Sequence, residues 1–446
     1  MSTNFSTDET GETPISYPFQ NIDYKLQILL LTATALLENG ASTAQTKRHL
    51  YRTALFLELP EGCMHSHIDY STVMINILDD KHVAHAAFSH SVARGVHLTK
   101  ISAVSRLIWR ATKRDYSLEK YEAELKRIME LPTGYSPKMQ GLGAGLTCGG
   151  ICHLFGGDLG AAVFIVFCAL AAFLVRRRCN EHHFNGYAGI VMSTFVGTAL
   201  ACLLPYLHLS ATPIHAILAA SIFLIPGIPL INSMEDILEG YILSGITRLA
   251  NTLFIIASIA FGIILALYLA GSEDITAVSI RPEGLYFTHA LAAAVNAIGL
   301  SLIFDLPKKL LAVVALGAII SVELRNIMLI HFSLNIIAAT FIGAATVGIL
   351  GQLINHRLKA PEGLLTLPSV IPLIPGVLLY RVLYALLNIS TIELTSLFAI
   401  IRNGIEAVTI ITVIAIGITI PMIFFRPYIE AEQRKRLEKV IVERYT

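Results

Sequence analysis

The tetrapeptide Leu-Ile-Pro-Gly occurs twice in this chain, at Leu224–Gly227 and at Leu373–Gly376, so that the two copies are offset by 149 residues. Each copy interrupts an apolar stretch long enough to cross a lipid bilayer. Proline removes a helical hydrogen bond and glycine loosens the backbone, so each copy predicts a break in a membrane helix. Paired breaks at matching places in two halves of a chain are typical of transporters, in which they mark a binding site near the bilayer midplane.

The composition excludes several classes of protein. The 446 residues are 54% hydrophobic and 15% charged, which is too apolar for a soluble globular protein, and the net charge of +1 does not favour nucleic-acid binding. No phosphate-binding loop is present, which argues against an ATP-driven pump. The six cysteines lack zinc-site or disulfide spacing. We therefore expect no metal, no cofactor and no enzymatic activity, and the polar N-terminus predicts no cleavable signal.

Apolar stretches after about residue 135 predict ten membrane spans. The first five are 138–155, 159–175, 186–207, 212–231 and 249–271; the second five are 284–304, 309–324, 328–352, 364–388 and 403–425. The first span is rich in glycine, which is typical of closely packed membrane helices. Basic residues such as Arg176, Arg177, Lys308 and Lys309 gather on one side, so the positive-inside rule places both termini in the cytoplasm of a multi-pass plasma (inner) membrane protein.

The spans divide into two sets of five. Since five is odd, two contiguous copies must enter the membrane in opposite senses, which predicts an inverted repeat. We expect a disordered N-terminus (1–21), a soluble α/β head (22–135), a first repeat (137–272), a second repeat (283–426) and a charged cytoplasmic tail (427–446). The fold class is thus an α-helical polytopic membrane protein with a small N-terminal domain.

Within the head, the pattern predicts two helices, a hairpin and two more helices. The strands are expected at 66–78 and 82–92, and the later helices at about 98–113 and 117–131, with Ser42 or Thr43 capping the second helix and Ser117 opening the last. Histidines are dense between His65 and His97. Metal binding and pH sensing are options for them, but we favour exposed strand residues with no joint role.

A family resemblance rests on the fourth and fifth spans. The sequence reads Ile225-Pro226-Gly227-Ile228-Pro229-Leu230-Ile231-Asn232, then Asp236, then Ser244-Gly245 and Arg248. This is similar to the P-G-x-x-x-x-N-x-x-x-D and G-x-x-R signature of the threonine/serine exporter family. The resemblance implies a ten-span secondary exporter of small hydroxy amino acids driven by the proton motive force. Other members are associated with small carboxylates, so export of a dicarboxylic acid is the alternative.

The residues predicted to bind the substrate are those of the two helix breaks, Pro226, Gly227, Pro375 and Gly376, together with Asn232. The ends of half-helices expose backbone amides and carbonyls that can hold a zwitterion. The alternative is that the breaks are structural kinks and that Asn232 only bonds a neighbouring helix.

Three charged residues are predicted to couple transport to protons: Asp236, Arg248 and Glu406. Asp236 and Arg248 are twelve residues apart and could share a helical face, whereas Glu406 follows Arg402, the expected counterpart of Arg248. The alternative is an interfacial salt bridge that holds an inside loop. His289 lies in the sixth span and could relay protons, although a satisfied core histidine is the simpler reading.

Alternating access by two inverted halves suits this chain better than a channel, which needs a ring of carbonyls or acidic groups. A membrane receptor is a weaker alternative. The expected partners are a small amino acid or carboxylate, protons and the lipid bilayer; a homo-oligomer is one option.

Overall fold

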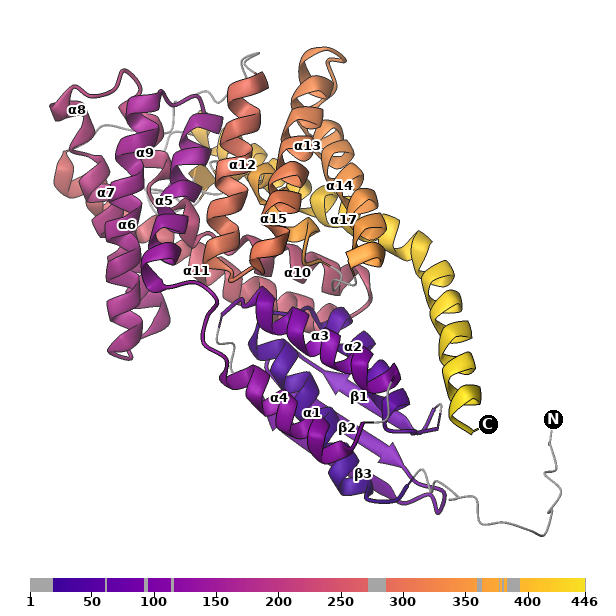
Figure 1. Cartoon of the computed structure of the whole chain (residues 1–446). Helices are drawn as coiled ribbons and strands as arrows, with labels where there is room; N and C mark the ends of the chain where they lie inside the picture. The colour runs from indigo at the N-terminus through magenta and orange to yellow at the C-terminus, as the bar shows by residue number, and fades with distance from the viewer. Residues whose placement is uncertain are drawn as a thin grey trace, which may run out of the picture.

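The computed structural model describes residues 19–60, 62–91, 95–113, 116–271, 286–358, 363–376, 378, 381–382 and 394–445. Figure 1 shows two parts, a helical part and, below it, a smaller α/β part that we call the head. The described residues leave out most of the expected disordered N-terminus and much of the expected ninth span, 364–388.

The head consists of four helices and one sheet. The helices are α1 (Ile22–Glu38), α2 (Thr43–Phe56), α3 (Leu98–Lys113) and α4 (Leu118–Glu130), and the strands are β1 (Met64–Ile68), β2 (Thr72–Leu78) and β3 (Ala84–His90). The sheet is antiparallel with the order β1-β2-β3. Alternate residues of β2, such as Val73 and Ile75, are fully buried on the face toward the helices, whereas Met74 and Phe88 are exposed on the other face.

The sequence-based boundaries in the head are confirmed with one exception. The helices predicted at 98–113 and 117–131 match α3 and α4, and Ser42 and Ser117 cap α2 and α4 through Gln45 N (3.1 Å) and Lys120 N (3.2 Å). The single strand predicted at 66–78 is wrong. The chain turns there, with Asp69 N donating to Thr72 O, because turn-forming residues interrupt the β-branched run.

The helical part begins with α5 (Pro137–Leu154), α6 (Leu159–Glu181), α7 (Gly186–Ala201), α8 (Leu204–Leu207), α9 (Pro213–Ala219), η1 (Ile222–Leu224), α10 (Gly227–Leu238) and α11 (Ile242–Ala270). It continues with α12 (Tyr286–Ile303), η2 (Lys308–Leu310), α13 (Leu311–Ile330), α14 (Ile336–Leu358), α15 (Thr366–Val370), η3 (Ile371–Leu373) and α17 (Leu394–Tyr445). The helix α17 runs on without a break through the range expected as a separate tail.

Six helical segments of the described chain are long and apolar enough to cross a membrane: Leu159–Glu181, Gly186–Leu207, Ile242–Ala270, Lys308–Ile330, Ile336–Ile354 and Leu397–Pro421. A seventh would be the bent pair Pro213–Leu224 and Gly227–Leu238, whose halves meet at 59°. The helix α12 contributes a shorter apolar stretch, Phe287–Ile303. These findings establish a polytopic, mostly helical membrane protein; the count of ten stays a prediction.

Element bounds recur along the helical part. Both bounds of α12 lie 149 residues after the corresponding bounds of α5, and the same spacing relates Leu159–Glu181 to Lys308–Ile330 and η1 to η3. The repeated tetrapeptide is therefore one point in a longer series of matching elements.

The helices α5 and α12 pack closely and run in opposite directions. A Cβ atom built on Gly143 would lie 2.7 Å from the Gly299 carbonyl oxygen, and one on Gly150 would lie 2.7 Å from that of Ala292. Later residues of α5 therefore lie beside earlier residues of α12, so the two helices are antiparallel. The glycine-rich first span predicted such close packing, and these contacts confirm it.

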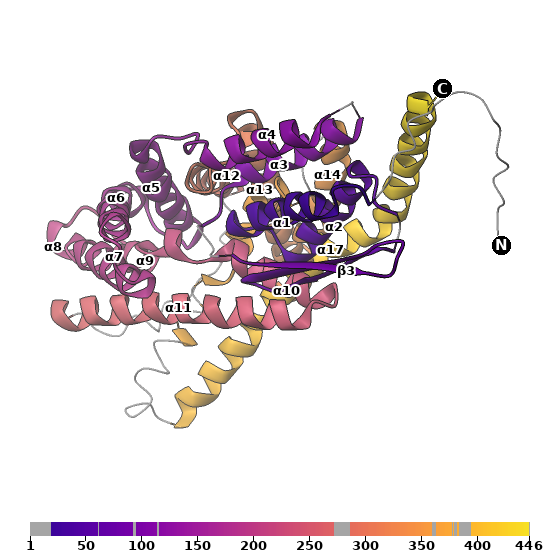
Figure 2. The same cartoon turned by 90° about the horizontal axis from the view of Figure 1, so that it is seen from below.

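The head is attached at the start of α5 and the end of α12. The backbone amides of Leu98 and Thr99 at the start of α3 donate to the carbonyls of Phe304 and Asp305 just after α12, each at 2.9 Å. The Tyr135 hydroxyl donates to Leu306 O at 2.9 Å. In Figure 2, which shows the molecule from below, α1 to α4 lie next to α10 and in front of α12 to α14. This packing brings the start of α2 against α10 and α11.

Candidate functional site

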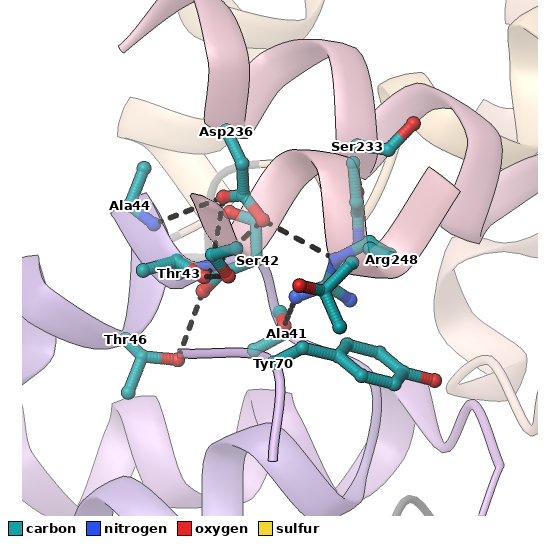
Figure 3. A network of polar contacts seen from close by, with 12 residues as sticks. Ala41, Ser42, Thr43, Ala44, Thr46, Tyr70, Ser233, Asp236 and Arg248 are labelled. Carbon is teal, nitrogen blue, oxygen red and sulfur yellow. Dashed lines mark hydrogen bonds and ion pairs between the residues drawn. The ribbon is translucent and has the colours of Figure 1, made fainter. Parts of the chain in front are cut away.

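The candidate site is a buried polar contact between the head, the end of α10 and the start of α11, drawn in Figure 3. Its centre is the Asp236 carboxylate near the end of α10. One carboxylate oxygen accepts hydrogen bonds from the backbone amides of Thr43 (2.8 Å) and Ala44 (3.3 Å). The other accepts from the Thr43 hydroxyl (3.2 Å) and from Nε of Arg248 (3.2 Å).

These partners explain how an acidic side chain can be fully buried here. Thr43 and Ala44 form the first turn of α2, in which backbone amides have no acceptor within the helix and the helix dipole favours negative charge. The Ser42 side chain caps Gln45 and leaves the two preceding amides to Asp236. Asp236 is 0% exposed, so its charge is balanced by these donors and by Arg248 rather than by water.

Arg248 is buried between α10 and the head. Its guanidinium pairs with Asp236, donates through a second nitrogen to the Ala41 carbonyl (3.4 Å) and lies over the Tyr70 ring, 5.2 Å from the centroid. Tyr70 belongs to the turn between β1 and β2, and its hydroxyl accepts from the side-chain amide of Asn251 (3.0 Å). The turn between β1 and β2 of the head therefore contacts α11 through both Arg248 and Asn251.

Asn232 extends the contact by one helical turn of α10. Its side-chain amide donates to the Gly40 carbonyl at 3.0 Å. Gly40 has φ +92 and would bring a Cβ within 3.0 Å of the Val96 side chain, so this turn requires glycine. At the outer edge, Arg48 of α2 pairs with Glu239 (3.2 Å) and Glu235 (3.6 Å).

The structure brings together three residues that the sequence analysis assigned to two roles. Asn232, predicted to bind substrate, contacts the head as do Asp236 and Arg248, which are predicted to couple protons. The expected Asp236–Arg248 pairing is confirmed. Their roles in substrate binding and proton coupling stay predictions.

The two Leu-Ile-Pro-Gly breaks have matching backbone geometry. Each follows a short 3₁₀ helix and leaves its isoleucine extended, with φ −62 and ψ 123 at Ile225 and φ −64 and ψ 131 at Ile374. The Gly227 and Gly376 amides both donate to the carbonyl of that isoleucine at 2.8 Å. The predicted helix break is thus present at Pro226 and at Pro375.

The two breaks also touch each other. A Cβ atom on Gly227 would lie 3.0 Å from Cδ1 of Ile374, and one on Gly376 would lie 3.2 Å from Cδ1 of Ile225. Segments 149 residues apart thus make the same contact in both directions. Gly227 begins α10, five residues before Asn232, which belongs to the head contact.

Glu406 is separate from both groups. It is half-buried on α17, and no ion pair joins it to a residue in the described ranges. Further along α17, the Thr412 hydroxyl approaches the Met234 sulfur of α10 at 3.9 Å. The predicted role of Glu406 as the second proton-coupling carboxylate stays a prediction.

Sequence reasoning missed the head side of the site. The sequence predicts Ser42 or Thr43 as a helix start, but it does not identify Thr43, Ala44 and Tyr70 as partners of Asp236 and Arg248. A helix start with two hydroxyl residues and unpaired backbone amides indicates an anion-binding site, but it does not identify which residue supplies the anion. Among the described residues, no three His, Cys, Asp or Glu side chains are placed to hold a metal ion.

Comparison with known proteins now adds to this geometry. The family model "Putative threonine/serine exporter" matches residues 27–270, and the model "Threonine/Serine exporter, ThrE" matches residues 289–424. The chain belongs to the threonine/serine exporter family. The first match spans the head together with the first five predicted spans, so the head is part of what defines the family.

Two relatives cover most of the chain. The "Probable threonine/serine exporter" of Mycobacterium tuberculosis is 24% identical over 81% of this chain and 69% of its own length. The "Threonine/serine exporter" of Corynebacterium glutamicum is 24% identical over 80% of this chain and 74% of its own. The "Probable succinate transporter subunit YjjP" of Escherichia coli is 27% identical over 53% of this chain and 91% of its own. No solved structure matches the chain.

Proposed function

We propose that this protein is a secondary active exporter of small amino acids such as threonine and serine, working by alternating access and driven by the proton motive force. The observation that carries the proposal is the reciprocal contact between the two Pro-Gly breaks, Gly227 on Ile374 and Gly376 on Ile225, in a member of an exporter family. Broken helices that meet between two repeats are the usual setting of a transporter's substrate site.

In this proposal the halves 137–272 and 283–426 are inverted repeats. The antiparallel packing of α5 against α12 supports this. These helices match at the 149-residue spacing, and two matching helices that run in opposite directions are related by a twofold axis across them. With ten spans the head and both termini are cytoplasmic. Alternating access is then a movement of one half against the other.

Substrate binding is assigned to the breaks, Pro226, Gly227, Pro375 and Gly376, with Asn232 at the head end of α10. Proton coupling is assigned to Asp236 with Arg248, and to Glu406 as the second carboxylate. The geometry suggests how Asp236 would act. Its negative charge holds the start of α2, so neutralising it would weaken the bonds to Thr43, Ala44 and Arg248 together.

The experiment is efflux of labelled threonine from proteoliposomes that contain the purified full-length protein, with and without an imposed pH gradient. We expect efflux that accelerates when the side away from the head is acidic and that is lost with a protonophore. Threonine flux that ignores the gradient would refute proton coupling, and no flux of threonine or serine would refute the amino-acid assignment.

A second candidate substrate is a small dicarboxylate. It is favoured by the relatives named as succinate transporter subunits, which match over 53% and 55% of this chain. Labelled succinate in the same vesicles separates the two candidates, because only a transported compound exchanges with its own labelled form across the membrane.

A further inference from the structure

Two histidines meet at the end of the α5–α12 pair that lies away from the head. His153 is in the last turn of α5 and His289 is in the first turn of α12, and their rings are edge to face with centroids 6.2 Å apart. His153 is half-buried, whereas His289 is buried. The pair therefore leads from the surface into the contact between the two helices.

The hydrogen bonds decide which ring nitrogen can take up a proton. Nδ1 of His153 lies 2.9 Å from the Gly157 carbonyl, which can only accept, so Nδ1 carries the hydrogen and Nε2 is the basic atom. Nδ1 of His289 lies 3.5 Å from the side-chain nitrogen of Asn326, whose oxygen faces Arg325 at 3.4 Å. Asn326 is thereby oriented to donate, and Nδ1 is the basic atom of His289.

Repulsion between the two rings limits the pair to one proton. On α13, Arg325 opposes positive charge and Glu323 favours it; at the start of α6, the Asp158 carboxylate is engaged by Ser210 (2.8 Å) and Ala211 (2.7 Å). On α9, His215 lies beside Gly156. Because two charged imidazoles this close repel each other, the first proton bound opposes the second.

The pair also breaks the internal repeat. With the 149-residue offset, the position in α5 that is equivalent to His289 is Gln140. The position in α12 that is equivalent to His153 is Leu302. The equivalent positions at the head end of the same two helices therefore cannot titrate near neutral pH. Two helices that otherwise match carry histidines at one end only, which makes the two sides of the protein chemically different.

Resting on the proposed function, we propose that His153 and His289 form the proton-accepting pair of the exporter on the side away from the head. One proton from water binds Nε2 of His153, and its positive charge opposes protonation of the adjacent His289 ring. Seven residues further along the same face of α12 lies Asn296, whose side-chain oxygen is buried without a donor among the described residues. This acceptor is the next polar group along the helix contact.

The test combines a titration and a flux measurement on the full-length protein. Histidine side-chain NMR of the labelled protein should show that His153→Gln moves the titration midpoint of His289 by about one pH unit, because the repulsion between the rings is removed. Unchanged midpoints would overturn the pair. His289→Gln gives the reciprocal measurement, and His153→Gln, at a half-buried site, provides the variant that folds more readily.

In proteoliposomes, both variants should keep threonine self-exchange within about twofold while pH-driven efflux loses its dependence on external pH between about 5.5 and 7.5. His208→Gln, in an exposed loop at the same end, is the matched control and should keep the native profile. Native profiles in both pair variants would overturn the proposal. Wild-type exchange without any response to a pH gradient would instead refute the proposed proton-driven function, while the NMR titration still decides whether the two rings oppose each other's protonation.

Discussion

Gly227 and Ile374 lie against each other so closely that a Cβ on the glycine would be 3.0 Å from the isoleucine Cδ1, and the equivalent contact joins Gly376 to Ile225 at 3.2 Å. The residues of each contact stand in different halves of the chain. The reciprocity means that neither break can be straightened without displacing the other. The first prediction follows from this relationship.

Replacing Pro226-Gly227 or Pro375-Gly376 by Ala-Ala should restore helical hydrogen bonding at one break and abolish threonine efflux, by about tenfold or more, in a protein that still folds. The measurement is flux in proteoliposomes beside a monodisperse elution profile. Pro229→Ala, two residues beyond the break in α10, is the control and should retain flux. A native rate in either double variant would show that the breaks are structural kinks.

Gly143→Ala should lower the stability of the protein by about 1–3 kcal/mol, because its methyl group would meet the Gly299 backbone oxygen at 2.7 Å and backbone cannot move aside cheaply. Gly186→Ala is the matched control, since nothing lies within 4 Å of its Cβ position. Thermal unfolding in detergent compares the two. Equal melting temperatures would contradict the close α5–α12 packing.

Ser210→Cys and Arg177→Cys should be labelled by an impermeant thiol reagent from opposite sides of the membrane. The two positions lie at opposite ends of α6, because Ser210 bonds Asp158 before its start and Arg177 stands near its end. Arg177 should face the cytoplasm. Labelling of both positions from the same side would rule out the ten-span topology.

Asp236→Asn should keep threonine self-exchange but lose pH-driven efflux if Asp236 carries the coupled proton. It should also cost about 1–3 kcal/mol of stability, because Arg248 loses its buried counter-charge. The double variant Asp236→Asn, Arg248→Gln removes both charges and should recover part of that stability. Recovery of pH-driven efflux together with stability would assign Asp236 to head docking alone; Glu406→Gln tests the second carboxylate in the same assay.

The head should lose stability on acidification through His49. Complete burial beside Arg48 and Arg52 lowers the pKa of His49 well below its usual value. The unfolded chain therefore binds a proton that the folded head refuses, and stability falls as the pH drops below about 6.5, by at most about 1.4 kcal/mol per pH unit. Unfolding at several pH values should show this slope reduced in His49→Gln and kept in Thr53→Val. An unchanged slope in His49→Gln would contradict the assignment.

Much of the helical framework was predictable because the signals are local. A bilayer needs apolar runs of fixed length. The segment expected at 159–175 falls within α6, and all but the last residue of the segment expected at 249–271 falls within α11. The breaks at Pro226 and Pro375 follow from proline's missing amide hydrogen. The pairing of Asp236 with Arg248 was also expected from their twelve-residue spacing, although the two residues lie on separate helices, α10 and α11, and not on one helical face.

Only the tertiary structure decided what these residues face. That Asp236 meets the first turn of α2, that Tyr70 covers Arg248 and that Gly227 touches Ile374 are contacts between segments far apart in the chain. Periodicity and composition report which face of a helix is buried, but not against what it is buried. The sequence by itself therefore determined a membrane protein with two broken helices. The three-dimensional packing decided that Asp236 and Arg248 contact the head and that the two Pro-Gly breaks contact each other.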